Sequence, residues 1–162
     1  TTPNTADECN WAKAPFNGGA SSYDEAYFNS VKDTVCPNGI LAKEYDAASH
    51  IMGGDWRMPT KEEFDELLNG TTNEWITNYN GTGVSGRKFT SKTDTSKYIF
   101  FPAAGGCYQR SVYDVGSYSD VWSSSLYASI SRNACDLRFN SDRCFVDFNG
   151  RSFGRSVRGV ME

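Results

Sequence analysis

The clearest helix signal in the chain is a short amphipathic pattern that follows Thr60. Phe64 and Leu67 are spaced so that they share one face of a helix. Thr60 is a favoured N-cap residue, and Glu63 stands three positions later, where its side chain can accept from the backbone N–H of the cap. The sequence therefore predicts a helix that begins after Thr60, buries this apolar stripe and ends at Gly70.

Two more helical segments are predicted in the first third of the chain. The first has apolar residues at the spacing of one helix face: Tyr23, Tyr27, Phe28 and Val31. The second covers residues 44–52 and is ended by the glycine pair at 53–54. Between them, residues 37–39 (Pro-Asn-Gly) predict a turn. Residues 1–40 are otherwise rich in turn-forming residues, so we expect this part to be irregular.

After residue 70 the pattern changes to short segments of strand type. Aromatic residues fill 97–102, and the other strand candidates are 121–126, 134–139, 143–148 and 156–161. Within 134–139, alternation places Leu137 and Phe139 on one face, and Asp136 and Arg138 on the other. Early helices and late strands together predict an α+β domain with a mostly antiparallel sheet.

Composition favours one folded domain over residues 1–162 and excludes several classes of protein. Of the 162 residues, 38% are hydrophobic and 14% aromatic, which is too much apolar surface for a disordered chain. A net charge of −4 argues against nucleic acid or an anionic membrane as the partner. The longest apolar run, 98–104, is far shorter than the ~20 residues that span a bilayer. No signal peptide is visible and the first residue is not Met, so we expect a processed product or a fragment.

Few residues have the spacing of a catalytic or metal site. His50 is the single histidine, and it lies near the end of a predicted helix, where a positive charge favours the helix dipole. The five cysteines contain no Cys-x-x-Cys pair and no zinc-type spacing, although Cys9 and Cys36 could form a disulfide. We therefore expect no metal, no cofactor and no enzymatic activity.

The distribution of charged residues is the most informative feature. All seven Lys lie at or before Lys97, and six of nine Arg lie at or after Arg132. Apart from the terminal Glu162, the last Glu is Glu74. Residues 127–155 contain no Lys, Glu, Gln, Met or Trp. Strand propensity explains part of this depletion, but not the Arg and aromatic residues at positions expected to be exposed, which are typical of an interaction surface.

Asparagine codons give a sharper explanation of the depletion. If either adenine of AAC or AAT is replaced by any base, the residues that result never include Lys, Glu, Gln, Met or Trp. These are the residue types missing from 127–155. Every residue type present in 127–155 belongs to the set that such changes of an asparagine codon can reach.

Four segments give the chain a resemblance to a known family. They are residues 53–64 (Gly-Gly-Asp-Trp-Arg-Met-Pro-Thr-Lys-Glu-Glu-Phe), 100–105 (Phe-Phe-Pro-Ala-Ala-Gly), 122–126 (Trp-Ser-Ser-Ser-Leu) and 156–160 (Ser-Val-Arg-Gly-Val). In this order they resemble the variable proteins of diversity-generating retroelements from gut bacteria and phages, over residues 40–162. The resemblance implies a C-type lectin-like fold, with two helices packed on a mostly antiparallel sheet and long loops. It also implies adenine-specific mutagenic retrohoming that rewrites a ligand-binding surface.

The resemblance places the variable positions within residues 118–155. They are Tyr118, Asp120, Tyr127, Ile130, Arg132, Asp136, Arg138, Arg143, Phe145, Asp147, Phe148, Asn149, Gly150, Ser152, Phe153 and Arg155. The implied constant frame is Trp122, Leu137, Phe139, Val146 and Val157. The chain departs from the family pattern at Val121, where relatives often have an aromatic residue, and at Cys135 and Cys144, which lie beside variable positions.

The implied function is recognition of a protein or other macromolecular ligand outside the cell, as a receptor-binding or adhesion domain on a bacterial surface or a phage virion. Calcium-dependent sugar binding is disfavoured, because no Glu-Pro-Asn, Gln-Pro-Asp or Trp-Asn-Asp string occurs. One alternative is a formylglycine-generating type of enzyme on a related fold, with Cys135 and Cys144 as its candidates. Another is a plain structural domain of a cell-surface protein.

Overall fold

The computed structural model describes residues 10–14, 17–108 and 111–161, and it has the predicted α+β class. Its helices are α1 (Glu25–Val35), α2 (Ala47–Met52) and α3 (Lys61–Gly70), with short 3-10 helices η2 (Trp11–Lys13), η3 (Pro37–Gly39), η4 (Lys43–Tyr45) and η5 (Tyr79–Gly81). Its strands are β1 (Trp56–Arg57), β2 (Thr71–Ile76), β3 (Gly86–Ser91), β4 (Tyr98–Pro102), β5 (Gly106–Tyr108), β6 (Ser111–Tyr113), β7 (Tyr118–Leu126), β8 (Asn133–Asn140), β9 (Cys144–Gly150) and β10 (Val160–Met161).

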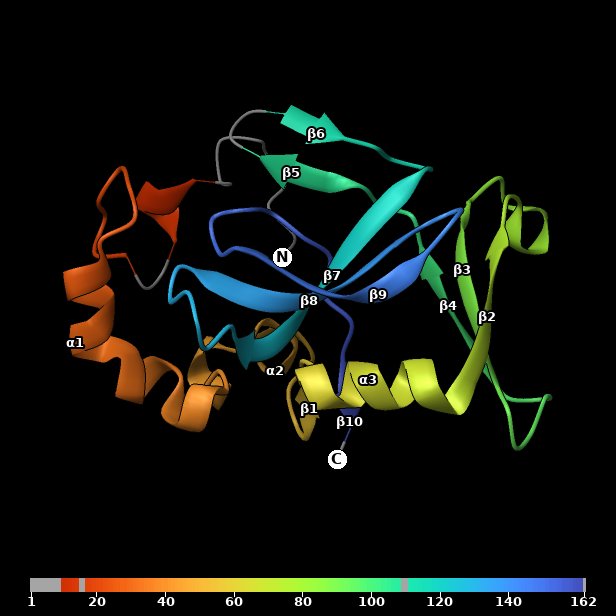
Figure 1. Ribbon diagram of the computed structural model, residues 1–162, viewed down its shortest axis with the longest axis horizontal. Helices are drawn as coiled ribbons and strands as arrows, with labels where there is room; N and C mark the ends of the chain where they lie inside the picture. The colour runs from red at the N-terminus through yellow and green to blue at the C-terminus, as the bar shows by residue number, and fades with distance from the viewer. Residues whose placement is uncertain (1–9, 15–16, 109–110, 162) are drawn as a thin grey trace.

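The strands form antiparallel sheets in the orders β7-β8-β9, β2-β3-β4, β5-β6 and β1-β10. Figure 1 shows α3 below the β7-β8-β9 sheet and the β5-β6 hairpin above it, with α1 at one end and β2-β3-β4 at the other. The pairing of β1 with β10 joins the segment before α3 to the C-terminal strand. Among the described residues, no helix is long and apolar enough to cross a membrane.

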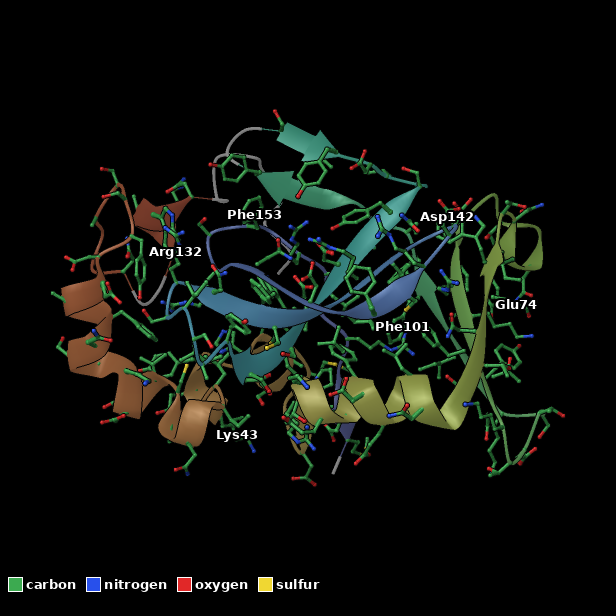
Figure 2. All side chains as sticks on the ribbon, viewed as in Figure 1. Lys43, Glu74, Phe101, Arg132, Asp142 and Phe153 are labelled. Atoms are coloured by element: carbon green, nitrogen blue, oxygen red, sulfur yellow. The ribbon has the colours of Figure 1, made fainter. Side chains whose placement is uncertain are left out.

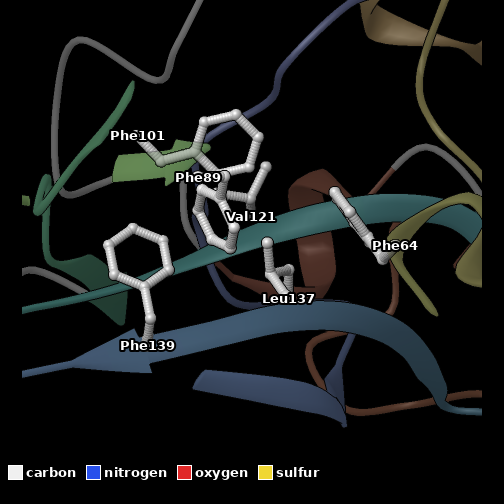
Figure 3. Close-up of a cluster of buried hydrophobic side chains, with 6 residues drawn as sticks. All are labelled: Phe64, Phe89, Phe101, Val121, Leu137 and Phe139. Carbon is white, nitrogen blue, oxygen red and sulfur yellow. The ribbon is translucent and has the colours of Figure 1, made fainter. Parts of the chain in front are cut away.

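The core lies between α3 and the two three-stranded sheets (Figure 3). It is a cluster of buried side chains: Phe64, Phe89, Phe101, Val121, Leu137 and Phe139. Leu137 and Phe139 are 0% exposed and pack in this cluster, whereas Asp136 and Arg138 alternate with them along β8 and so point to the opposite face of the sheet. The alternation predicted for β8 is confirmed.

The predicted start of α3 is also confirmed. The Thr60 side chain accepts from the Glu63 N–H at 3.2 Å, and Glu63 Oε2 accepts from the Thr60 N–H at 2.8 Å. Arg57 of β1 donates to both oxygens of Glu63 at 2.7 Å, and these bonds hold the pKa of Glu63 below its usual range. The cap therefore fixes α3 to the small β1-β10 sheet.

Because the hydroxyl of Thr60 satisfies one orphan N–H of α3, Thr60→Ala is expected to lower the free energy of unfolding by about 1 kcal/mol. Thr60→Ser keeps the hydroxyl and should retain most of this stability. Urea denaturation of the three proteins measures the difference. If the serine variant loses as much stability as the alanine variant, the hydrogen bond of the cap is not what stabilises the helix.

The structure corrects two of the predicted elements. Residues 44–52 do not form one helix: α2 begins at Ala47, because the buried Asp46 accepts hydrogen bonds from the N–H groups of Ser49 (2.9 Å) and Met58 (2.8 Å) and so caps the helix there. The predicted strand 156–161 is reduced to β10, and Ser156 makes only an isolated bridge to Val121. Strands β1, β2, β3, β5 and β6 are additional to the sequence prediction, and the described residues form three α-helices where the resemblance implied two.

Candidate functional site

Candidate positions from three strands meet on the face of the β7-β8-β9 sheet that points away from α3. In the sheet register, Arg138 of β8 lies between Asp120 of β7 and Phe145 of β9. Asp136 of β8 lies opposite Asp147 of β9. The structure thus brings together residues that the sequence placed up to 27 positions apart on separate strands.

Polar side chains on this face form two neighbouring groups, which together we call the Asp–Arg network. Ion pairs join the first group, Asp120, Arg138, Asp147 and Arg155, and a hydrogen bond joins the second, Asp136 and Asn149. Arg138 binds Asp120 through Nε at 3.0 Å and Asp147 through Nη1 at 2.5 Å. Nη1 of Arg155 lies 2.5 Å from Oδ2 of Asp120, in an ion pair without hydrogen-bond alignment. The Asp120 side chain is fully buried, so it is neutralised by these two arginines rather than by water.

The β5-β6 hairpin covers the network. Arg155 Nη1 donates to the Tyr113 hydroxyl of β6 at 2.7 Å, and the Tyr118 hydroxyl donates to Asp120 Oδ1 at 2.6 Å. Burial raises the pKa of both phenols, and for Tyr118 the hydrogen bond to Asp120 adds to this effect, so both stay protonated at neutral pH. Tyr113 belongs to the site but was missed by the sequence reasoning, because nothing in its own segment links it to Arg155.

Asp136 is the most perturbed carboxyl of the network. Its Oδ2 accepts from Asn149 Nδ2 at 2.5 Å, whereas its buried Oδ1 has no hydrogen-bond partner among the residues that the structure describes. Burial, and secondarily the charge of Asp120, raise the pKa of Asp136 to about 7. Because its side chain is 0% exposed, Asp136 cannot touch a ligand in this conformation.

The candidates that reach the surface lie along β9 and in the loops around the β7-β8-β9 sheet. One of them, Phe148, lies opposite the buried Cys135 and so points to the same side of the sheet as Leu137. The rings of Tyr127 and Phe148 stack with their centroids 3.9 Å apart. Arg132 is exposed beside the N-terminal elements (Figure 2), where its neighbour Ser131 accepts from the Tyr23 hydroxyl at 2.7 Å. The rim candidates, which we call the contact set, are Tyr127, Ile130, Arg132, Arg143, Phe145, Phe148 and Phe153.

Four candidate positions do not lie on the outward surface expected from the sequence. They are Asp120, Asp136, Ser152 and Arg155, each at most 7% exposed. Strand alternation correctly turned Asp136 away from the core, and Asp120 points to the same face, but the hairpin and the segment after β9 cover that face. Conversely, Val157, expected in the constant frame, is 36% exposed. The remaining candidates, Tyr118, Arg138, Asp147, Asn149 and Gly150, are half-buried, as are Tyr127, Phe145 and Phe153 of the contact set.

The two cysteines of the enzyme alternative do not share a cleft. In the β8-β9 ladder Cys135 lies opposite Phe148 and Cys144 opposite Phe139, four residue pairs away. This is about 14 Å along the strands. Both are free thiols, and burial raises the pKa of Cys135 and brings that of Cys144 to about 11, which disfavours the reactive thiolate.

The other sequence candidates for chemistry are likewise separated. His50 is exposed on α2, away from the network. Cys36 is a buried free thiol, and Cys9, its suggested partner, lies outside the described residues. Among the described residues, no group of three or more His, Cys, Asp or Glu side chains has the geometry to hold a metal ion.

Comparison of the chain with protein-family models, with curated protein sequences and with solved structures found no match in any of the three. A functional assignment therefore has to come from the residues and geometry of the chain itself.

Proposed function

We propose that the chain is a ligand-binding domain with a C-type lectin-like fold, whose C-terminal surface is diversified by adenine-specific retrohoming and recognises a macromolecule outside the cell. One observation carries the proposal. The segment that lacks Lys, Glu, Gln, Met and Trp is the same segment that forms β8, β9 and their loops. Its Asp136, Arg138, Phe145 and Asp147 lie on the face of the sheet turned away from the α3-backed core, whereas Leu137 and Phe139 pack in that core.

The fold supports such a function because the buried core cluster and the residues of the contact set are separate groups. The buried cluster around Leu137 and Phe139 holds the sheet against α3, independently of the side chains on the rim. Substitutions at exposed positions usually change stability by about 0.5 kcal/mol or less, so the rim tolerates many sequences. Its present residues suit recognition: aromatic rings give contact area at low entropic cost, and arginine gives forked donors.

The Asp–Arg network divides the candidate positions into two roles. Replacing Asp120 removes the carboxylate that the buried Arg155 pairs with, and replacing Arg155 leaves the buried Asp120 with Arg138 as its remaining cation. Folding therefore restricts what these positions can become. Among the described residues, no member of the contact set takes part in a buried ion pair. We therefore assign ligand contact to the contact set, and the positioning of the hairpin and the segment after β9 to the network.

A library tests this assignment. The contact set is randomised, displayed, and selected against two unrelated proteins, hen lysozyme and streptavidin. A control library randomises as many exposed positions at the other end of the molecule: Glu62, Glu66, Thr72, Glu74, Asn78, Thr82 and Lys92. We expect binders to both targets from the first library and none from the second. Equal yields from the two libraries, or binders from neither, would contradict the proposed function.

A further inference from the structure

The loop between β7 and β8, residues 127–132, is hydrogen-bonded to the N-terminal part of the chain. The Tyr23 hydroxyl donates to Ser131 Oγ at 2.7 Å, and Ser131 Oγ donates in turn to Glu25 Oε1 of α1 at 3.1 Å. These bonds join residues that are 108 and 106 positions apart in the sequence. Figure 1 shows α1 and this loop at the same end of the molecule.

The β7-β8 loop carries three members of the contact set: Tyr127, Ile130 and Arg132. Ile130 and Arg132 are exposed, and Ser131 between them is half-buried. Figure 2 shows Arg132 beside the N-terminal elements. Because Ser131 is the residue between these two side chains, a bond that holds its hydroxyl also fixes the backbone from which both of them project.

Tyr23 is itself held in place by a buried amide. Asn17 is 1% exposed, and its side chain donates to three backbone carbonyl groups, including that of Ser22 at 2.8 Å. Its Oδ1 accepts from the Asp24 N–H at 2.8 Å. These bonds fix the backbone on both sides of Tyr23, so the hydroxyl meets the loop from a rigid support.

Arg151, in the segment after β9, is a second link between the loop and α1. Its backbone N–H donates to the Arg132 carbonyl at 3.0 Å. Its guanidinium carbon lies 3.8 Å from the centre of the Phe28 ring, which is 0% exposed. Ser131 and Arg151 both lie in the segment that lacks Lys, Glu, Gln, Met and Trp, yet their side chains contact the N-terminal part of the chain.

We propose that Tyr23 positions the β7-β8 loop for ligand binding through Ser131, and that Ser131 and Arg151 are constant positions inside the diversified segment. The proposal rests on the proposed function of the contact set. Tyr23 and Phe28 lie outside residues 118–155, so every copy of the domain holds the loop in the same way. A loop that is ordered before binding loses less conformational entropy when the ligand binds.

Hydrogen exchange of the chain without ligand tests whether Tyr23 holds the loop. Tyr23→Phe and Ser131→Ala each remove the bond between the two hydroxyls. In both variants we expect the amides of Ile130 and Asn133 to exchange about fivefold faster, while that of Leu137 in β8 keeps its rate. The matched control is Tyr27→Phe, which removes the hydroxyl of a 41% exposed tyrosine of α1 and should change neither rate.

The binders selected against lysozyme and streptavidin test the role in recognition. We take those that lose affinity when position 130 or 132 is replaced by alanine. Biolayer interferometry should show Kd weakened by about fivefold in Tyr23→Phe and in Ser131→Ala. Ser131→Thr keeps the hydroxyl and should retain the affinity. The double substitution Tyr23→Phe/Ser131→Ala should be no worse than either single one, because both remove the same bond.

The outcomes separate this role from the proposed function. A Kd that stays within twofold in Tyr23→Phe and Ser131→Ala, unchanged exchange rates, or binders none of which depends on position 130 or 132 would overturn the role of Tyr23 and leave the contact set standing. Sibling copies in which Ser131 and Arg151 vary as freely as Ile130 would show that these positions are not constant. A library that yields no binders overturns the proposed function, and the role of Tyr23 in recognition falls with it, whatever the exchange rates.

Discussion

Replacing Arg155 by alanine is expected to lower the free energy of unfolding by about 3–5 kcal/mol. This is the largest loss of stability that we predict for a single substitution. The side chain of Arg155 is 3% exposed and pairs with the fully buried Asp120. It also donates to Tyr113 and lies 4.8 Å from the centre of the Phe153 ring. Alanine removes the cation of Arg155 and leaves Asp120 with Arg138 as its remaining partner. Because Asp120 is fully buried, water cannot replace the lost partner. Chemical denaturation measures the loss.

Two further variants identify the cause. Arg132→Ala removes an exposed arginine of the same segment and should change stability by about 0.5 kcal/mol or less. Adding Asp120→Asn to Arg155→Ala removes the buried carboxylate charge that has lost one of its two arginines, and should restore part of the stability. If Arg155→Ala costs no more than Arg132→Ala, the network does not hold the hairpin, and Arg155 is free to bind ligand after all.

Stability is expected to fall between pH 4 and pH 7 through the titration of Asp136. In the folded protein this carboxyl keeps its proton up to a pKa of about 7, because it is buried beside Asp120. In the unfolded chain its pKa is about 3.9. Between these values the folded state binds more protons than the unfolded state, so raising the pH destabilises it, by about 4 kcal/mol in total. The contribution is fully present below pH 4 and is lost above pH 7.

Asp136→Asn isolates this contribution. The amide cannot ionise, and its oxygen still accepts from Asn149, so the variant should lack this part of the slope and be more stable than the wild type at pH 8. Asp142→Asn, at the exposed turn after β8, should keep the wild-type slope. Urea denaturation at pH 4, 6 and 8 gives the comparison. An unchanged slope in Asp136→Asn would show that Asp136 is ionised or solvated in the folded protein.

The elements that the sequence predicted correctly depend on local contacts. The Thr60 cap of α3 joins residues three positions apart, and the faces of β8 follow from strand geometry alone. Strands β2 and β3 were missed because polar residues dominate them. Phe89 of β3 packs in the core beside residues of other elements, and this long-range contact gives no local signal in the sequence. The late start of α2 likewise depends on the Asp46 bond to Met58, which is distant in sequence.

The difference between local and long-range contacts also explains which part of the site could be predicted from the sequence. Composition identified the segment, and alternation gave the faces of residues 136–139 in β8. Neither shows what covers that face. The burial of Asp120 and Arg155 depends on Tyr113, 42 residues before Arg155, and on the pairing of Cys107 with Gly154. Such contacts leave no periodic signal in the sequence, so network and rim were first separated by the structure.

The measurement that tests the account most directly is the sequence of this gene, with its downstream region, in sibling isolates. We predict that substitutions concentrate at the contact set, replace adenines of asparagine-type codons, and never produce Lys, Glu, Gln, Met or Trp there. The buried Asp120, Asp136 and Arg155 should vary less than the rim. A near-repeat of the 3′ coding end should lie close to a reverse-transcriptase gene. Substitutions spread evenly over the chain, in codons of every type, would contradict the account.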